Sequence, residues 1–299
     1  MKMSKKDTGA IKQTSKAGIA GIYVVLGILA ITIIVPIAWV FLASLKENEQ
    51  FYGSPWTLPN GLHFENFVQA WTEAEMGSYM LNSVIVTALG ILLLIVISLP
   101  AAYVLARFKF KSSKFWNILF MAGLFINVNY IVVPIFLMLV DADTFLRQTF
   151  GNGFFLNNLF VLALIYASTA LPFTIYLLSG YFKSLAKDYE EAAYVDGAGY
   201  FRTMVQVIFP MAKPSIITII LFNFLSFWNE YIISMTMLTK AELKTLPVGL
   251  MNLMAAQRSA VQYGRMYAGL VIVMVPTLIL YMCVQKQLTE GMTVGGLKG

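Results

Sequence analysis

Hydrophobic residues are gathered into long blocks along the chain, and short polar or charged segments separate these blocks. A membrane-crossing helix needs about 20 largely apolar residues. Six blocks meet this requirement, so the pattern predicts six transmembrane helices. They cover residues 17–45, 79–106, 115–140, 158–182, 214–238 and 266–284. The first block is longer than the apolar core of a signal peptide, about 7–15 residues, and we therefore expect an uncleaved helix.

The composition supports this interpretation. Hydrophobic residues make up 59% of the chain and charged residues 12%, and the mean hydropathy is +0.73. A soluble domain has about 45–50% hydrophobic and about 25% charged residues. A soluble globule and a disordered chain are thereby excluded. The chain has one cysteine, Cys283, and one histidine, His63. An internal disulfide and a metal site built on several Cys or His residues are therefore excluded. The fold class predicted is an all-α polytopic membrane protein.

Lys and Arg residues indicate the orientation, because cytoplasmic loops carry an excess of them. With the N-terminus in the cytoplasm, the inside segments 1–16, 107–114, 183–213 and 285–299 hold 15 of the 21 basic residues, and the outside loops hold six. This asymmetry explains the net charge of +6 without a nucleic acid. We expect cytoplasmic tails at 1–16 and 285–299, a first helix at 17–45, and a five-helix core at 79–284.

The outside segment 46–78 is rich in turn-forming and aromatic residues. Aromatic side chains are common where a protein meets the membrane–water interface. Interfacial anchoring is one interpretation of this segment, and a docking surface for an external partner is the other.

The cytoplasmic loop 183–213 carries the most specific pattern. Asp188 is expected to cap a short helix whose first turn carries Glu190 and Glu191, since acidic side chains are favourable at a helix N-terminus. Gly197 and Gly199 are expected to end this helix. A second helix comes next, with apolar residues at i, i+3, i+4 and i+7: Phe201, Met204, Val205 and Ile208. Pro210 is expected to end it, and Pro214 to open the next span. From the residues alone, a loop that lies on the membrane without a partner remains an alternative.

The spacing within this loop resembles the EAA loop of ABC importer permeases. That family has Glu-Ala-Ala, three residues, Gly, nine residues and Ile-x-Leu-Pro. Here Glu191-Ala192-Ala193 is followed after three residues by Gly197, and nine residues later by Val207-Ile208-Phe209-Pro210. Val207 and Phe209 replace Ile and Leu and keep the apolar character.

Further segments resemble the carbohydrate-uptake permeases of maltose type, over about residues 60–299. They are Glu65-Asn66-Phe67, Tyr79 with Asn82-Ser83, Phe227-Trp228-Asn229-Glu230-Tyr231, Thr245-Leu246-Pro247-Val248-Gly249-Leu250 and the glycine-rich end up to Lys298-Gly299. This resemblance implies a type-I importer permease fold that forms half of a translocation pathway for a sugar or oligosaccharide.

The resemblance also implies which partners the chain has. The EAA loop would sit in a groove of a cytosolic ABC ATPase dimer, through Glu191, Ala192, Ala193, Asp196, Gly197 and Pro210. The chain contains no G-x-x-x-x-G-K-[ST] phosphate loop, so ATP and Mg would be used by the partner, and this chain would be neither an enzyme nor bound to a cofactor. A second, related permease and a solute-binding protein would complete the complex in a bacterial cytoplasmic membrane, with both termini in the cytoplasm.

Polar residues at bilayer depth are costly and usually face a bundle interior or a cavity. The candidate residues for a solute pathway are Asn127 and Asn129 in the third span, and Asn223, Ser226 and Glu230 on one face of the fifth. Hydrogen bonding between helices is the competing interpretation for the Asn and Ser residues, and simple solvation is the one for Glu230. Competing functions are the same role for another polar solute such as a glycerol-phosphate, a secondary carrier, and a membrane enzyme.

Overall fold

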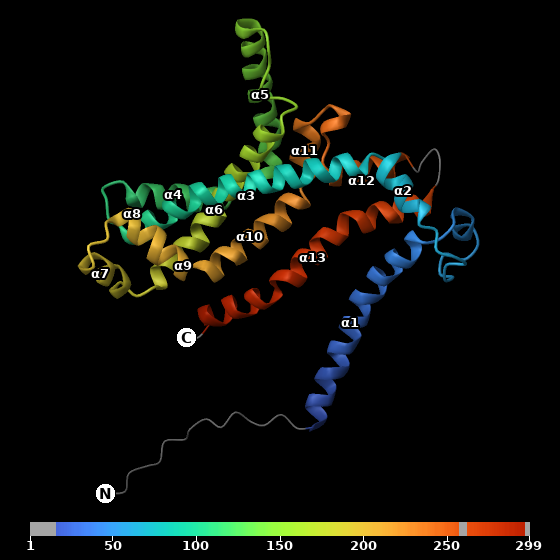
Figure 1. Cartoon of the computed structure of the whole chain (residues 1–299), viewed down its shortest axis with the longest axis horizontal. Helices are drawn as coiled ribbons and strands as arrows, with labels where there is room; N and C mark the ends of the chain where they lie inside the picture. Colours follow the sequence, from blue (N-terminus) through green and yellow to red (C-terminus); the bar gives the residue numbers. More distant parts are fainter. Residues whose placement is uncertain (1–15, 257–261, 297–299) are drawn as a thin grey trace, which may run out of the picture.

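The computed structural model describes residues 16–256 and 262–296, and within these ranges the backbone is helical and contains no strand (Figure 1). The predicted tail 1–16 lies almost wholly outside the described residues, and so do the last three residues of the predicted tail 285–299. The prediction of an all-α membrane protein is confirmed.

Five helices lie side by side and form the body of the molecule: α3 (Met76–Arg107), α4 (Ser113–Gly123), α6 (Leu159–Ser184), α10 (Lys213–Trp228) and α13 (Tyr263–Gly296). α3 packs along α6, α4 covers α6, and α10 packs against α3, α6 and α13. Figure 1 shows these helices running along the long axis of the molecule.

Short elements gather at the two opposite ends of this body (Figure 1). We name these ends internal and external after the orientation predicted from the Lys and Arg residues. The internal end is formed by α7 (Asp188–Val195), α8 (Tyr200–Thr203), the π-helical turn η2 (Met204–Ile208) and α9 (Phe209–Met211). The external end is formed by η1 (Asn48–Phe51), α2 (Glu65–Thr72), α11 (Ile232–Met237), η3 (Ala241–Leu243) and α12 (Leu246–Ala256). The candidate functional surfaces belong to one of these two ends or to the helices that join them.

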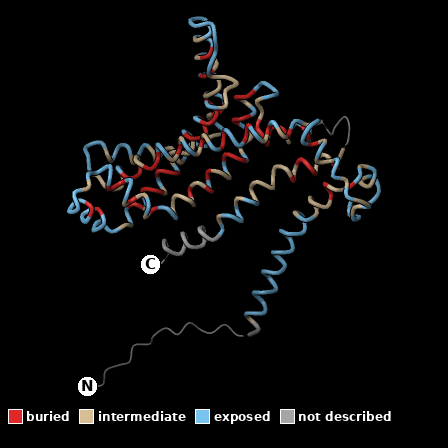
Figure 2. Tube along the Cα trace, in the orientation of Figure 1, coloured by how far each residue is buried: buried red, intermediate tan, exposed pale blue. Residues whose placement is uncertain are grey.

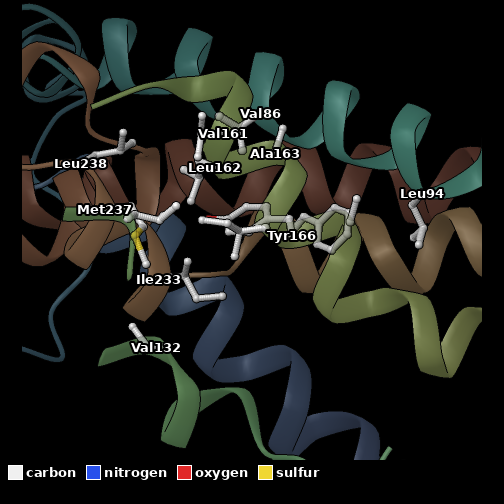
Figure 3. Packing of buried hydrophobic residues seen from close by; sticks show 14 residues of the cluster. Val86, Leu94, Val132, Val161, Leu162, Ala163, Tyr166, Ile233, Met237 and Leu238 are labelled. Carbon is white, nitrogen blue, oxygen red and sulfur yellow. The ribbon is translucent and has the colours of Figure 1, made fainter. Parts of the chain in front are cut away.

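Buried apolar side chains join α3 to α6 and to the external elements. Figure 3 shows Leu162 and Tyr166 of α6 close to Val86 of α3 and to Ile233 and Met237 of α11. Because lipid is as apolar as these side chains, close packing rather than the hydrophobic effect holds such helices together. A second cluster fixes the internal end and contains Leu99, Tyr103, Leu178, Phe182, Met204 and Ile208.

The number of spans agrees with the prediction of six only if a bent pair of helices is counted as one. Within the described residues, five helices are long and apolar enough to cross a membrane: α1 (Lys16–Ser44), α3, α5 (Val128–Phe150), α6 and α13. The sixth candidate combines Tyr200–Met211 with Lys213–Trp228, and these two segments meet at 75°. α10 alone has 16 residues, fewer than the roughly 20 that a span needs.

The third predicted span, 115–140, is not one helix. α4 ends at Gly123 and α5 begins at Val128, because Asn127 adopts an extended backbone and its side-chain oxygen accepts a hydrogen bond from the Asn129 amide at 3.0 Å. An Asn in this position caps a new helix. Figure 1 shows α5 leaving the body and crossing the direction of α3 and α6. Hydropathy alone does not reveal this break, because apolar residues lie on both sides of it.

The fifth predicted span, 214–238, is also not one helix. It is divided after Trp228, and α11 starts at Ile232 because the Glu230 carboxylate accepts hydrogen bonds from the Ile233 and Ser234 amides at 2.7 and 2.9 Å. The last predicted span, 266–284, agrees with the apolar segment Tyr263–Gln285, and the helix itself continues to Gly296. Polar residues that leave the apolar layer still form a helix, so falling hydropathy does not mark its end.

The first helix, α1, separates from the body over most of its length. Its residues 18–44 have a mean hydropathy of 2.8 in their most apolar window, and that window contains no buried residue. Figure 2 shows this helix as exposed almost throughout, and Figure 1 shows it meeting α13 at the external end. Such a surface is stable only when lipid or another apolar helix covers it.

Candidate functional site

The internal loop begins with α7, a short helix with an acidic first turn. Asp188, Glu190 and Glu191 lie in this turn, where negative charge is favourable at the positive end of the helix dipole. The residue at the N-cap position is Lys187, and Asp188 is already helical. The expected capping role of Asp188 is therefore wrong by one position, although its charge still favours the helix.

Gly197 ends α7 in the left-handed conformation, with φ of +80°. Two backbone hydrogen bonds close the turn: Ala198 N donates to Ala193 O at 2.9 Å, and Gly197 N donates to Tyr194 O at 3.0 Å. This pair of bonds defines a Schellman motif, in which glycine is favoured because a Cβ is costly at positive φ. The three-residue spacing between Glu-Ala-Ala and Gly thus places the glycine where the helix must stop.

The predicted apolar stripe on the second helix is divided between two faces. Met204 and Ile208 are buried in the internal cluster, whereas Phe201 and Val205 are exposed. The π-helical turn η2 explains this division, since it inserts about one extra residue into the turn and rotates the residues after it. Four positions that would share one face of a regular helix therefore point in different directions.

Pro210 does not end the second helix, contrary to the prediction. It lies in the first turn of α9, where its missing amide costs little, and the helical path continues to Met211. The break comes at Ala212, and the chain then bends by 75° into α10. Pro214 lies in the first turn of α10, as predicted.

A hollow of about 370 Å³ lies between α7 and the second helix. Its walls are Tyr189, Ala192, Ala193, Asp196, Ala198, Arg202, Gln206 and Val207. Several apolar side chains of the same two helices are exposed: Val195, Tyr200 and Phe201. Exposed apolar side chains together with a recess that holds an acidic and a basic side chain are typical of a surface that binds another protein.

The predicted coupling residues differ in exposure. Glu191, Ala192, Asp196, Gly197 and Pro210 are solvent-accessible on this loop. Ala193, in contrast, is only 8% exposed. A bulky side chain at Ala193 would therefore disturb the loop itself, whether or not a partner binds there.

The attachment of α7 to the spans was not predicted from the sequence. Glu190 pairs with Arg107, the last residue of α3, through Oε1 and Nε at 3.0 Å. Arg107 Nη2 also donates to the Leu185 carbonyl at 3.0 Å. The sequence gives two signals for this contact. One is Glu190, the acidic residue before Glu-Ala-Ala, and the other is Arg107, the single arginine of the basic segment 107–114.

The predicted pathway residues of the third span lie at the break between α4 and α5. Asn127 caps α5, and Asn129 lies two residues later. The sequence predicted both residues at the middle of one span, but the structure places them where two helices meet. The capping bond explains Asn127 without a solute, and a role for either residue in a pathway stays a prediction.

The other three predicted pathway residues do not share one face of a helix. Asn223 is buried and donates to Thr174 Oγ1 of α6 at 3.2 Å, which is a bond between helices. Ser226 is exposed. Glu230 lies beyond the end of α10, and Tyr166 donates to its Oε2 at 2.8 Å. Contact with a solute stays a prediction for all three residues.

Two of the segments that resemble the maltose-type permeases contact each other at the external end. Asn82 Nδ2 donates to the Glu242 and Lys244 carbonyls at 2.9 and 3.0 Å, and Leu246 N donates to Ser83 Oγ at 2.8 Å. A Cβ at Gly249 would overlap the Tyr79 ring, so only glycine allows α12 to pack here. We call these contacts of Asn82 and Ser83 with residues 242–246 the external latch.

The fold and the loop define a class of protein: a polytopic α-helical membrane protein with an exposed, recessed loop at one end of its helices. Residues 95–294 match the family described as "Binding-protein-dependent transport system inner membrane component". The chain belongs to this family. The resemblance to ABC importer permeases that the EAA spacing indicated is thereby confirmed.

Individual relatives cover nearly the whole chain. The diacetylchitobiose uptake system permease protein NgcG of Streptomyces coelicolor is 36% identical over 89% of this chain and 84% of its own length. The probable ABC transporter permease protein YurM of Bacillus subtilis is 34% identical, covering 94% and 89%. The melibiose/raffinose/stachyose import permease protein MelC of the same organism is 30% identical, covering 91% and 94%.

A solved structure shares the fold. A chain of a bacterial ABC transporter involved in the import of the acidic polysaccharide alginate superposes with a TM-score of 0.76. The alignment covers 93% of this chain and 99% of that chain, at 24% identity. This likeness confirms the importer permease fold.

Proposed function

We propose that this chain is the membrane-spanning subunit of an ATP-driven importer for a sugar or oligosaccharide. The observation that carries the proposal is the internal loop, which combines a helix closed by Gly197, a recess and several exposed apolar side chains. The substrate class is supported by relatives named for the uptake of diacetylchitobiose and of melibiose, raffinose and stachyose.

The ATPase would be a separate polypeptide that docks on this loop. Glu191, Ala192 and Asp196 would contact it directly, with Gly197 holding the turn and Ala193 packing beneath the contact surface. ATP and Mg would be bound by a dimer of that ATPase, because this chain has no phosphate loop of its own. The loop would then lie in the cytoplasm, which agrees with the excess of Lys and Arg on that side.

A second, related permease would complete the pathway. The pathway of a type-I importer runs between two permease halves, and Ser226 of α10 is exposed within this chain. The bare surface of α1 would be covered by lipid and by this second subunit. A solute-binding protein would deliver the sugar at the external end of a bacterial cytoplasmic membrane.

Another polar solute is the second candidate for the same role. A relative from Agrobacterium fabrum, 28% identical, is named for the transport of sulfoquinovosyl glycerol. That name points to a solute that combines a sugar with a charged group. Uptake measured with a panel of neutral and anionic solutes would distinguish a sugar or oligosaccharide from another polar solute as the substrate.

Co-purification tests the proposal. The tagged chain is extracted in a mild detergent from its native membrane, and every protein in the complex is identified by mass spectrometry. We expect a dimeric ABC ATPase, a second permease and a lipid-anchored or secreted binding protein. A complex that contains this chain as its sole permease would refute the pairing with a second, related permease, but it would still agree with an ATP-driven importer. A chain that purifies without any ATPase would contradict the proposed function.

A further inference from the structure

One ion pair attaches α7 to the membrane helices. The carboxylate of Glu190 and the guanidinium of Arg107 lie 3.0 Å apart, and their side chains are only 12% and 5% exposed. Of the charged residues in α7, all of which the structure describes, Glu190 alone is buried. The neighbouring Glu191 is exposed and belongs to the docking surface. Two adjacent glutamates therefore face opposite ways, one toward the bundle and one toward solvent.

The burial of this pair makes it costly to separate, although its Nε and Oε1 atoms meet as an ion pair and not in hydrogen-bond geometry. Exposed ion pairs are flexible and contribute little, whereas removing one partner of a buried pair leaves an uncompensated charge and is strongly unfavourable. Arg107 is held further by its bond to the Leu185 carbonyl, just before α7 begins. The Tyr103 hydroxyl, one turn earlier on α3, lies beside Glu190. A displacement of α7 therefore moves the end of α3 with it.

The other end of α3 carries the external latch. Asn82 and Ser83 bond to three backbone groups of residues 242–246, the segment that leads from α11 into α12. α3 is unbroken between these two contacts and passes through Pro100 without interruption. At 1.5 Å per residue, Asn82 and Arg107 are about 37 Å apart along the helix. Packing against α6 along its length supports this helix.

We propose that Arg107 and Glu190 are positioning residues that transmit movement of the docking loop through α3 to the external latch. This inference rests on the proposed function, because the movement originates in the ATPase. When the ATPase pair closes and displaces α7, the ion pair carries α3 along. Asn82 and Ser83 then shift residues 242–246, and with them α11 and α12. The two ends of the molecule are thus connected by one helix with a polar contact at each end.

The test uses the complete complex in lipid vesicles, with a reporter at each end. Cys283 is the single cysteine, so Cys283→Ser combined with Ala241→Cys places one thiol beside the external latch. The rate of thiol modification at position 241, with and without ATP, reports movement there. Uptake of labelled sugar per ATP hydrolysed reports coupling. Retention of the ATPase on the permease reports docking.

The variants are Glu190→Gln, Arg107→Gln and the double variant with both changes. Each keeps the docking residues, so we expect normal ATPase retention and continued hydrolysis. Uptake per ATP should fall about tenfold, within the range for residues that modulate coupling between sites. The ATP-dependent change at position 241 should disappear. Lys109→Gln and Asp188→Asn each remove an exposed charge close to one partner of the pair and should behave as the parent protein.

The double variant separates transmission from a simple defect of burial. It leaves neither charge unpaired, so if the single variants fail only because of a lone buried charge, it recovers normal coupling, and the proposal is overturned. We expect it to remain as uncoupled as either single variant. The proposal is also overturned if the single variants keep the response at position 241, or if they lose the ATPase and hydrolysis together with uptake.

The parent complex distinguishes this inference from the proposed function. If the parent chain fails to retain an ATPase, the proposed function itself is contradicted. If the parent chain retains the ATPase and transports sugar but position 241 does not respond to ATP, the proposed function stands and the transmission to the external latch is refuted. If the parent chain passes both measurements and the variants match it, only the role of the Arg107–Glu190 pair is refuted.

Discussion

Replacing Gly197 tests whether the Schellman turn at the end of α7 is required for docking. Its φ is +80°, and no described atom beyond its chain neighbours lies within 4 Å of a Cβ built there. The cost of a side chain is therefore conformational rather than steric. For an L-residue in the left-handed region this cost is about 1 kcal/mol, which lowers the population of the closed turn about fivefold.

Gly199 supplies the matched control. A Cβ at this position also has no described neighbour within 4 Å, but φ is −75°, which any L-residue adopts. Gly197→Ala should weaken ATPase binding about fivefold, and Gly199→Ala should leave it unchanged. The ATPase affinity of Gly197→Asn should lie between that of the parent protein and that of Gly197→Ala, because Asn tolerates positive φ better than other side chains. Gly197→Pro should abolish binding, since the proline ring fixes φ near −65°.

The assay is titration of the purified ATPase onto vesicles that contain each variant, with the amount of inserted permease measured alongside. The expected order of affinity is Gly, Asn, Ala and Pro at position 197. Equal affinities for Gly197→Ala and Gly199→Ala would refute the idea that the left-handed turn shapes the docking surface. Full binding by Gly197→Pro would refute it more directly.

Four other measurements check the orientation and the polar contacts of the spans. A reporter fused after Lys111 should lie in the cytoplasm and one fused after Gly153 outside; the reverse would overturn the orientation. Asn223→Ala should lower the free energy of unfolding in detergent by about 1 kcal/mol, since it removes a bond between helices, and an unchanged stability would contradict this. Ser226→Ala, at an exposed position, should leave stability unchanged and, if the face is a pathway, alter uptake. Glu230→Gln should cost about 2 kcal/mol, because a charged acceptor of hydrogen bonds is lost, and denaturant unfolding would show it.

Hydropathy predicted the helical class because a span is a simple requirement on composition and length. It failed at the third and fifth spans for one common reason. Asn127 and Glu230 start new helices by accepting backbone amide hydrogens, and a hydropathy average does not register a capping bond. These capping bonds also give Asn127 and Glu230 local partners, while their role in a pathway stays a prediction.

The internal loop was predictable to a different degree. The Glu-Ala-Ala to glycine spacing located the turn at Gly197, because the conformation that ends the helix requires glycine. The stripe from Phe201 to Ile208 was not predictable from a period of 3.6 residues, since the π-helical turn changes that period. The contact between Arg107 and Glu190 joins residues far apart in the chain, and no local pattern indicates which charges meet.

The energy source of transport tests the central claim most directly. Vesicles are prepared with the complete complex, with ATP and Mg enclosed on the side of the internal loop, and with the binding protein and labelled oligosaccharide on the other side. We predict uptake that requires ATP, the ATPase and the binding protein together, and that does not respond to a proton or sodium gradient. Uptake driven by such a gradient through this chain alone, without the ATPase, would show a secondary carrier and would contradict the proposed importer.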